Sequence, residues 1–289
     1  MALTEQIYFD KVTIIGTGLI GASVALALRE KGLCRTIVGF GRKEENLKRA
    51  KERGIIDEYN LDAAAATGGA DLVVLCTPVG MLKDVTVSIR AALKKGTLVT
   101  DVGSVKGALV AELEFVMPDG VDFVGSHPIA GSDKSGIGDS RGSLFAGARC
   151  IVTPTLRSSK AAVDKVIALW ELSGGLVECM DPFRHDEIFA LVSHLPHIVA
   201  YALVNAAERT DPGCVEYSGG GFRDTTRIAA SSPELWRDIC KMNRDNLLNV
   251  LDSFKGNLLK IEQCLKENDW AGIEKEFSKA QKLRMSIDK

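Results

Sequence analysis

A histidine between an apolar segment and a glycine-rich loop is the first residue of this sequence with evident chemical potential. The chain has only four histidines, and one of them, His127, lies in the segment GSHPIAGSDKSG at residues 125–136. An imidazole with a pKa near neutral pH can take a proton from a reacting hydroxyl group. Pro128 follows directly and stiffens the backbone where the side chain leaves the predicted strand. His127 is therefore a candidate general base, although a structural histidine bonded to backbone would give the same pattern.

Ser104 is the second candidate, because it follows the preceding predicted strand in the segment TLVTDVGS, residues 97–104. Ligands of parallel sheets bind beyond the carboxyl ends of the strands, so Ser104 and His127 are expected to face one crevice. Ser104 would then present its hydroxyl to the histidine or to a substrate. The alternative is that Ser104 only caps the helix that follows.

A glycine motif near the start of the chain predicts a dinucleotide site. GTGLIG, residues 16–21, has the GxGxxG spacing between a predicted strand and a predicted helix. Gly16 would permit the tight turn, Gly18 the approach of a pyrophosphate, and Gly21 the close packing of helix and strand. A tight turn without a ligand is the alternative. Thr17, Leu19 and Ile20 complete the predicted loop.

Two further segments are predicted to contact the cofactor. The second predicted strand ends in VGFGRK, where Gly41 takes the place of the acidic residue that usually holds the ribose of NAD, and Arg42 follows. An arginine without the acid slightly favours the 2′-phosphate of NADP, whereas an arginine that packs on adenine would admit either cofactor. Cys76, Thr77 and Pro78 follow the third main strand and would border the nicotinamide, and Ser104 after the next strand is also included in the predicted cofactor-binding set.

These segments belong to a chain that alternates strand and helix patterns up to about residue 180. Its strands are nearly all apolar, which is typical of a parallel sheet covered on both faces. From residue 181 onward only helical patterns remain, and the segments 184–209, 224–268 and 270–287 all carry helical periods. We therefore predict an α/β fold: a Rossmann-type, doubly wound, mostly parallel sheet at residues 1–180 and an all-helical domain at residues 181–289.

Composition excludes several classes of protein. The formal net charge is −2 and no basic cluster is present, so no nucleic-acid partner is expected. Seven cysteines without a CxxC pair indicate reduced thiols in the cytoplasm. The uncharged stretch at residues 12–28 is near the minimum length of a membrane helix, but its glycines divide it into strand, turn and helix, so no membrane association is expected.

The motifs together resemble those of the prephenate/arogenate dehydrogenase family of tyrosine biosynthesis. The resemblance is carried by GTGLIG, CTP, DVGSVKG, GSHPIAGSDKSG, SHLPH, GGGFRDTTRIA and WRDI, in this order, from Lys11 to beyond Trp236. It implies that the chain oxidatively decarboxylates prephenate or arogenate, both of which are small molecules. A hydride would be transferred from the substrate to NAD or NADP. No metal is implied.

The resemblance also assigns roles to individual residues. His127 would accept the proton of the substrate hydroxyl, and Ser104 would bond that hydroxyl and orient the histidine. Arg227 would anchor a carboxylate, and His197 would bind near the substrate side chain. Charges in the variable stretch after the HPxAG motif would help to distinguish prephenate from arogenate. The full predicted substrate-binding set is Ser132, Asp133, Ser193, His197, Gly220, Arg227 and Trp236.

Several alternatives stay open at this stage. His194 and His197 could share a metal ion, Arg227 could pair with Asp224, and Trp236 could fill the core. His185 and Asp186 are interpreted as a helix start. A 3-hydroxyacid dehydrogenase would use a helix lysine as its base, and a sensor that only binds NADP(H) would need no base at all.

The resemblance further implies a homodimer formed through the helical domain, whose apolar faces have little to cover within one subunit. No appended regulatory or chorismate mutase domain is expected. Any inhibition by tyrosine is therefore expected to act at the active site.

Overall fold

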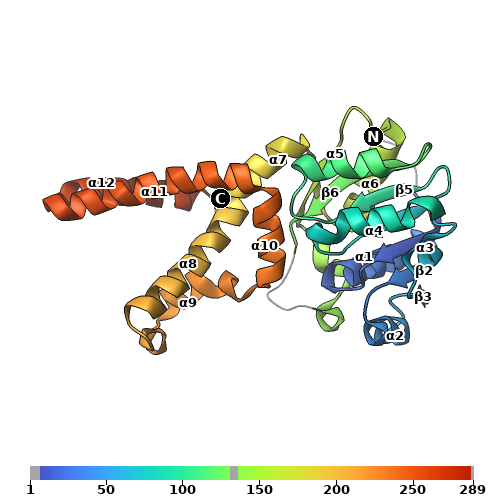
Figure 1. Cartoon of the computed structure of the whole chain (residues 1–289), viewed down its shortest axis with the longest axis horizontal. Coiled ribbons are helices and arrows are strands. Elements are labelled where there is room, and N and C mark those ends of the chain that lie inside the picture. The colour runs from blue at the N-terminus through green and yellow to red at the C-terminus, as the bar shows by residue number, and fades with distance from the viewer. Residues whose placement is uncertain (1–6, 131–135, 288–289) are drawn as a thin grey trace. The chain divides into compact units, whose positions relative to one another are not determined.

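A computed structural model describes residues 7–130 and 136–287 and contains one eight-stranded sheet (Figure 1). The strand order is β3-β2-β1-β4-β5-β6-β7-β8, and all neighbours are parallel except β6 and β7. The predicted mostly parallel, doubly wound sheet is therefore confirmed. The strands are β1 Phe9–Ile15, β2 Cys34–Phe40, β3 Glu58–Asn60, β4 Leu72–Leu75, β5 Leu98–Asp101, β6 Asp122–Pro128, β7 Arg149–Thr153 and β8 Leu176–Cys179.

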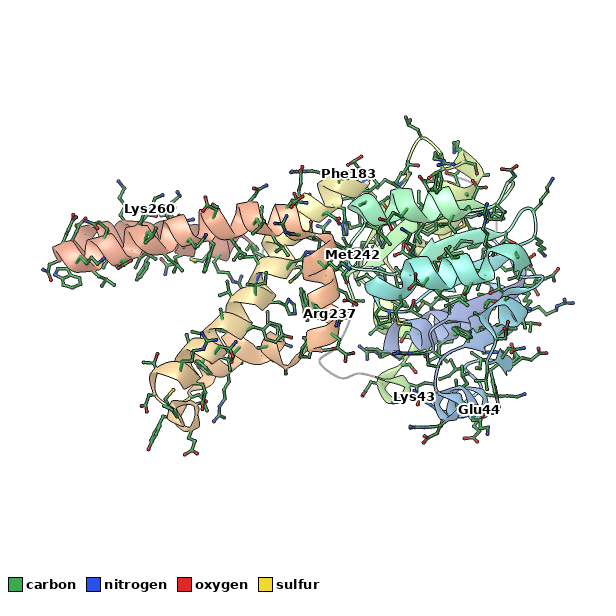
Figure 2. All side chains as sticks on the ribbon, in the orientation of Figure 1. Lys43, Glu44, Phe183, Arg237, Met242 and Lys260 are labelled. Carbon is green, nitrogen blue, oxygen red and sulfur yellow. The ribbon has the colours of Figure 1, made fainter. Side chains whose placement is uncertain are left out.

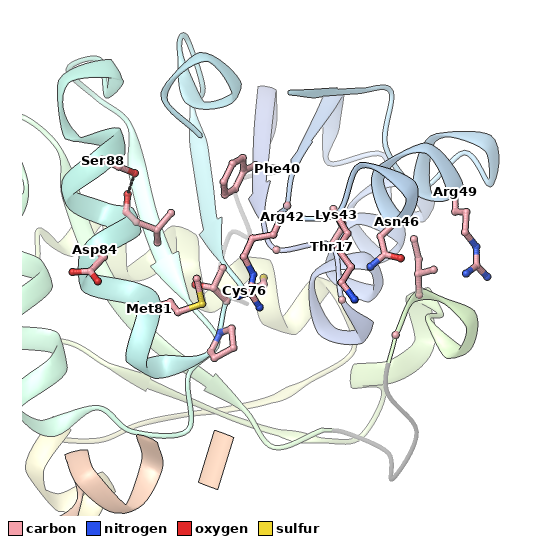
Figure 3. A pocket seen from close by; sticks show the side chains of 18 of the residues that line it. Thr17, Phe40, Arg42, Lys43, Asn46, Arg49, Cys76, Met81, Asp84 and Ser88 are labelled. Atoms are coloured by element: carbon pink, nitrogen blue, oxygen red, sulfur yellow. Dashed lines mark hydrogen bonds between the residues drawn. The ribbon is translucent and has the colours of Figure 1, made fainter. Parts of the chain in front are cut away.

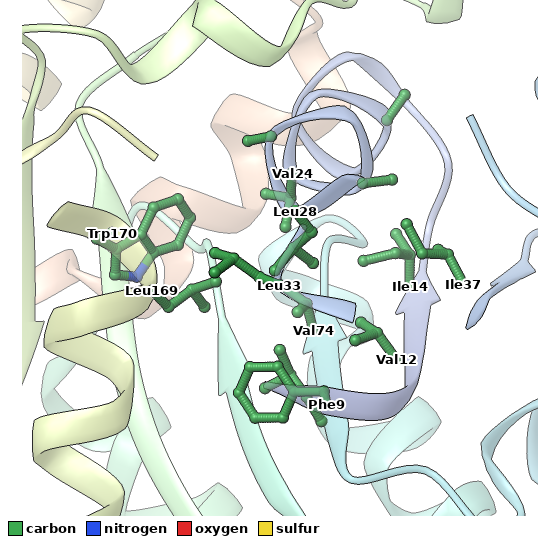
Figure 4. Packing of buried hydrophobic residues seen from close by; sticks show 14 of the residues in the cluster. Phe9, Val12, Ile14, Val24, Leu28, Leu33, Ile37, Val74, Leu169 and Trp170 are labelled. Carbon is green, nitrogen blue, oxygen red and sulfur yellow. The ribbon is translucent and has the colours of Figure 1, made fainter. Parts of the chain in front are cut away.

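The central strands are buried because both of their faces are covered. Every residue of β4 and of β5 is buried, as expected for strands with helices on both sides. One cluster of the core joins Val12 and Ile14 of β1 to Leu28 and, farther along the chain, to Trp170 (Figure 4). The helices of this region are α1 Leu19–Glu30, α2 Glu44–Glu52, α3 Ala63–Thr67, α4 Leu82–Ile89, α5 Gly107–Val116 and α6 Lys160–Leu172.

The strand order reverses between β1 and β4, and this reversal positions the site. From β1 the chain continues outward through β2 and β3, and then returns to place β4 on the other side of β1. Loops that leave β1 and β4 at their carboxyl ends therefore diverge and leave a crevice between them. The glycine loop and the segment Cys76–Pro78 lie at these two strand ends.

After β8 ends at Cys179, all described regular elements are helical. The first is a long helical run made of α7 Pro182–Phe189, a π-helical segment Ala190–His194, and α8 Leu195–Thr210. Asp181 caps its start by accepting hydrogen bonds from the backbone N–H groups of Phe183 and Arg184. The helices α9 Gly220–Thr226 and α10 Pro233–Met242 follow.

The segment over residues 224–268, which carries helical periods in the sequence, is divided into separate helices at two places. Ser232 accepts a hydrogen bond from the N–H of Leu235, and Pro233 starts α10 as a new helix. Proline cannot supply the N–H that an uninterrupted helix requires, so a break at this position has a direct cause. A second break separates α10 from α11 Arg244–Glu267.

The chain divides into two compact units, the first ending at Asn243 and the second beginning at Arg244. The second unit consists of α11 and α12 Trp270–Ile287, joined by a tight turn in which Asn268 has a positive φ of 56°. Side chains project along the length of both helices, among them the labelled Lys260 (Figure 2). The last strand ends one residue before the predicted domain boundary at residue 180, and that boundary stays a prediction.

Two apolar segments bear on the question of a membrane. The uncharged stretch at residues 12–28 is divided into β1, the glycine turn and α1, as predicted. The helical run Pro182–Thr210 is long and apolar enough to span a membrane by length and composition alone. His185, Asp186 and His194 of this run are buried and hydrogen-bonded within the first unit.

Candidate active site

Glycine is present at each of the three glycine positions of the motif GTGLIG for a different geometric reason. Gly16 has a φ of 105°, and a Cβ atom there would lie 2.8 Å from the carbonyl oxygen of Cys76. A Cβ atom on Gly21 would lie 2.0 Å from the carbonyl oxygen of Gly16. Gly18 has no described heavy atom within 4 Å of its Cβ position, so its outer side is open. Two glycines thus serve the turn and its packing, and one leaves room for a ligand.

A cavity of about 750 Å³ opens beside this loop (Figure 3). Met81 and Asp84 lie on one side of it, and Arg42 and Asn46 lie on the other. Of the predicted cofactor set, Leu19, Ile20, Gly21 and Ser104 do not line it. The predicted residues that do line it are Gly16, Thr17, Gly18, Gly41, Arg42, Cys76, Thr77 and Pro78.

The wall of the cavity has features that fit a dinucleotide. The hydroxyl of Thr77 is buried, and it has no hydrogen-bond partner among the described residues. Such an orphaned polar atom next to an open glycine suits a polar ligand. No acidic residue occupies the end of β2, where Gly41 stands, and three cationic side chains line this end of the cavity: Arg42, Lys43 and Arg49.

All four histidines of the chain lie in the first unit, around the end of β6. His127 lies on β6, and the remaining three lie on the helical run that begins at Pro182. His185 belongs to α7, His194 ends the π-helical segment, and His197 belongs to the first turn of α8. A π-helical segment alters the angular spacing of a helix and is frequent at functional sites.

A chain of hydrogen bonds connects His127 to the start of α5. Nδ1 of His127 lies 2.8 Å from Nε2 of His185, and Nδ1 of His185 lies 2.8 Å from Oδ1 of Asp186. The Asp186 carboxylate also accepts hydrogen bonds of 2.8 Å from the backbone N–H groups of Lys106 and Gly107. Asp186 therefore caps α5 from a distant part of the sequence, and Ser104, half-buried in the bend before the helix, does not.

Burial keeps His127 neutral. Its pKa is well below the ordinary value, because the buried site penalises the charged ring and because His185, Lys106 and His194 add positive potential. Phe189 packs at 4.9 Å from the His127 ring and stacks at 4.3 Å on the His185 ring, measured between ring centroids. A neutral imidazole at this position can accept a proton at ordinary pH.

His194, His197 and Trp236 form a stacked group next to this chain. The His197 ring lies 3.6 Å from the Trp236 ring between centroids, and its Nδ1 donates to the carbonyl oxygen of Ser193. The Nε2 atom of His197 is thereby left as an acceptor. Nδ1 of His194 accepts from the side-chain amide of Asn243 at 3.0 Å. Burial lowers the pKa of His194 to about 4 and also lowers that of His197.

The lysine at the start of α5 is not available as a base. Lys106 is fully buried and forms an ion pair with the carboxylate of Asp101, which also accepts from the N–H of Gly103. A buried ammonium held by a carboxylate in this way serves the structure rather than a ligand. The lysine base of a 3-hydroxyacid dehydrogenase therefore has no counterpart in Lys106.

Comparison with known proteins identifies the family. The family model described as "Prephenate dehydrogenase, nucleotide-binding domain" matches residues 24–179, and the one described as "Prephenate dehydrogenase, dimerization domain" matches residues 181–279. The chain belongs to the prephenate dehydrogenase family. The resemblance inferred from the motifs is thereby confirmed.

Similar proteins cover almost the whole chain. The cyclohexadienyl dehydrogenase of Zymomonas mobilis is 35% identical over 283 residues, 96% of each protein. The structure of prephenate dehydrogenase from Aquifex aeolicus in complex with hydroxyphenyl propionate and NAD+ is 36% identical, with a TM-score of 0.92 over 98% of this chain and 100% of that one. The Synechocystis arogenate dehydrogenase structure is 28% identical, with a TM-score of 0.81 over 96% and 99%. These relatives do not favour a 3-hydroxyacid dehydrogenase or a sensor.

The prephenate dehydrogenase fold brings only part of the predicted substrate set together. His197 is hydrogen-bonded to the backbone carbonyl of Ser193 and stacks on the ring of Trp236. Arg227 follows α9, where its charge helps to lower the pKa of His197, and Gly220 is the exposed first residue of α9. Ser132 and Asp133 lie outside the described residues.

The sequence interpretation missed the partners of His127. His185 and Asp186 were interpreted as a helix start, and Asn243 drew no attention. The only available signal was the scarcity of histidine: a chain with four such residues places all of them in one site. Neither spacing nor hydrophobic pattern indicates that residues 127 and 185 meet, because their contact depends on how α7 packs on the sheet.

Proposed function

We propose that this chain oxidatively decarboxylates prephenate or arogenate, with transfer of a hydride to NAD(P)+. One observation carries the proposal: the four histidines gather at the end of β6, and one of them, His127, is kept neutral by burial. Both candidate substrates have a ring hydroxyl on the carbon that gives up the hydride, and a base that takes the hydroxyl proton in this step can return it when the product phenol forms. Family membership supplies the reaction class, and the neutral imidazole supplies the base.

The chain's own residues would act as follows. His127 would accept the hydroxyl proton as hydride leaves the same carbon, and it would return the proton to the phenolate oxygen once the ring carboxylate is lost as carbon dioxide. Ser104 would donate a hydrogen bond that orients the hydroxyl. A nicotinamide held in the cavity would supply the acceptor for the hydride. Cys76, Thr77 and Pro78 would hold its ring beside the site, since they line the cavity at the end of β4.

The substrate carries two carboxylates, which require cations and hydrogen-bond donors. We assign the ring carboxylate to Arg227 and the side chain to His197 and Ser193, supported by Trp236, on which the His197 ring stacks. Gly220, Ser132 and Asp133 complete the proposed set. The charges of Asp133 and Lys134 are proposed to discriminate between the keto group of prephenate and the amino group of arogenate.

For the cofactor we propose that NADP+ is used at least as well as NAD+. The support is the absence of an acid at Gly41 and the presence of Arg42 and Lys43 in the wall of the cavity. Replacement of Arg42 by alanine should lower the ratio of kcat/KM for NADP+ to that for NAD+ about tenfold, the worth of one charge-assisted contact. An unchanged ratio would remove Arg42 from the cofactor site, and a Lys48→Ala variant, altered at an exposed residue of α2, serves as the control.

We further propose a cytoplasmic homodimer formed through the helical part. The family model for residues 181–279 is a dimerisation domain, and several large apolar side chains there are exposed: Leu191, Val192, Leu203, Leu259, Trp270, Phe277 and Leu283. A second copy would cover such surfaces by isologous contacts. Light scattering on the purified protein should give twice the mass of the chain.

The deciding experiment is a four-way assay. Purified protein is given prephenate or arogenate with NAD+ or NADP+, and the reduced cofactor is followed by its absorbance. Turnover of at least one of the four combinations is expected, and its product should be 4-hydroxyphenylpyruvate or tyrosine. Cofactor binding without turnover of either substrate would contradict the proposal and favour a sensor. Saturating tyrosine should inhibit competitively, if the site itself is the point of regulation.

A further inference from the structure

The state of Asp186 determines the protons along the hydrogen-bond chain that ends at His127. Two backbone N–H groups, of Lys106 and Gly107, donate to its two oxygens. Backbone N–H groups can only donate, so both oxygens must act as acceptors. A carboxylate at the start of a helix is further stabilised by the positive end of the helix dipole. Asp186 is thus an ionised acceptor.

The state of His185 follows from that of Asp186. Since the carboxylate only accepts, Nδ1 of His185 carries a hydrogen and donates it to Oδ1 over 2.8 Å. His185 is completely buried, and burial lowers its pKa although Asp186 acts in the opposite direction. The ring is therefore neutral, and its Nε2 is a lone-pair acceptor.

That acceptor faces Nδ1 of His127 at 2.8 Å. We propose that His185 and Asp186 are positioning residues that hold His127 in its Nδ1–H form and so reserve the Nε2 lone pair for the substrate proton. The inference rests on the proposed function, because it treats His127 as the base. In a neutral imidazole only one nitrogen is free to accept a proton, and the hydrogen bond made by the other nitrogen decides which one it is.

The arrangement also supports the state in which the base has taken its proton. His127 then carries a hydrogen on both nitrogens, and Nδ1–H continues to donate to the neutral His185. The negative charge of Asp186 lies behind His185 and partly compensates the new positive charge, as the aspartate does in the serine protease triad. Without these two residues, the buried His127 would keep the positive potential of Lys106 and His194 and would lose the compensating charge of Asp186.

The packing fixes the two rings as well as the protons. Phe189 stacks on His185 at an interplanar angle of 24°, and it also contacts the ring of His127. Asn243 donates to the backbone carbonyl of Asp186 and thereby ties α10 to α7. The charged and titratable groups around the pair are Lys106 and Asp101 from the β5–α5 segment, Asp186 from α7 and His194 from the π-helical segment.

The test compares two replacements of His185. His185→Phe keeps the ring and its stacking on Phe189 but removes the acceptor for His127. His185→Gln supplies a side-chain amide oxygen that can take the place of Nε2. We expect His185→Phe to lower kcat about thirtyfold with less than about a threefold change in KM for substrate or cofactor. His185→Gln should recover most of this loss.

The matched control is Glu187→Gln, on the same helix. Glu187 is exposed and pairs only with Arg184 at the surface, among the described residues. Its kcat should equal that of the wild type. Equal kcat for His185→Phe, His185→Gln and the wild type would overturn the proposal, as would equal losses in the two His185 variants.

A spectroscopic measurement tests the tautomer without turnover. The chain has only four histidines, so ¹⁵N-histidine spectra can be assigned with single substitutions. We expect the His127 ring in wild-type protein to carry its hydrogen on Nδ1 at neutral pH, and this form to be lost in His185→Phe. A wild-type His127 with its hydrogen on Nε2 would refute the proposal even if His185→Phe failed to fold.

The two proposals fail in distinguishable ways. If the four-way assay shows no turnover but His127 carries its hydrogen on Nδ1, the proposed function is wrong and the proposed hydrogen bond between His127 and His185 still holds. If turnover is normal and depends on His127 but not on His185, and if His127 carries its hydrogen on Nε2, the positioning role of His185 is wrong and the proposed function still holds.

Discussion

The cofactor half and the substrate half of this site are built in opposite ways. The cofactor half is a loop of six consecutive residues, GTGLIG, beside an open cavity whose cationic side chains are exposed. The substrate half is a set of buried and half-buried side chains from β6, α7, the π-helical segment, α8 and α10, linked by hydrogen bonds and stacked rings. The residues of the cofactor half are neighbours in the sequence and lie next to solvent. The residues of the substrate half come from distant parts of the sequence and are largely buried.

Solvent therefore affects the charged and titratable side chains of the two halves differently. An exposed cation contributes little to stability and is free to bind a ligand phosphate. A buried imidazole has its pKa set by the surrounding protein, because water cannot screen it. Substitutions in the cofactor half should therefore change binding, whereas substitutions in the substrate half should change the chemical step or the stability of the fold.

The largest effect is expected for His127→Asn. The asparagine amide can still donate to Nε2 of His185, so the inner hydrogen bond survives, but no nitrogen remains to accept the substrate proton. We expect kcat to fall about a hundredfold or more while the Kd for the cofactor stays unchanged. Steady-state kinetics and cofactor titration measure the two quantities. A variant with near-normal kcat would show that the buried half is structural.

Acid should destabilise the substrate half through His194. Burial lowers its pKa from 6.5 to about 4, so its neutral form stabilises the fold above pH 6.5, and this contribution is lost as the pH falls from 6.5 toward 4. The complete loss is on the order of 3 kcal/mol of the free energy of unfolding.

The measurement is denaturant unfolding between pH 4.5 and 7.5 on wild type and His194→Asn. The amide oxygen of the variant can still accept from Asn243, but it does not titrate. The stability of the variant should therefore fall less steeply toward acid than that of the wild type. Parallel curves for the two proteins would exclude His194 as the source of acid sensitivity.

A pair of glycine substitutions sharpens the contrast within the cofactor half itself. In Gly21→Ala the new Cβ atom would lie 2.0 Å from a backbone oxygen, and we expect a loss of about 2 kcal/mol in the free energy of unfolding. In Gly18→Ala the same atom meets nothing within 4 Å. That variant should keep its Tm and raise the Kd for the cofactor about tenfold. The prediction is contradicted if both variants lose stability alike.

The smallest effect is expected at the exposed edge of the substrate half. Arg227→Ala should raise KM for the substrate about tenfold with little change in kcat, because a carboxylate anchor contributes to binding more than to the chemical step. Arg209→Ala, altered at an exposed residue of α8, is the control. A fall in kcat without a change in KM would place Arg227 with the buried, chemical part of the site.

Much of the fold could be predicted because its signals are local. Apolar strands, helix periods and the glycine motif each occupy a few consecutive residues, and the order of elements then leads to a doubly wound sheet. The short β3 and α3 went unpredicted, since segments of three and five residues carry too little periodicity. The helical period continues on both sides of Pro233, so the period alone does not show that a new helix starts there.

The sequence by itself determined the cofactor loop, the alternation that forms the sheet and the identity of His127 as the candidate base, since each depends on neighbouring residues and their intrinsic conformational preferences. Only the tertiary structure decided that Asp186 caps α5, that His185 meets His127 and that Trp236 stacks on His197. These contacts join residues that are 39 to 80 positions apart, as in the 80 between Lys106 and Asp186 and the 58 between His127 and His185. Such contacts depend on how helices pack against a sheet, and no short-range pattern encodes that packing.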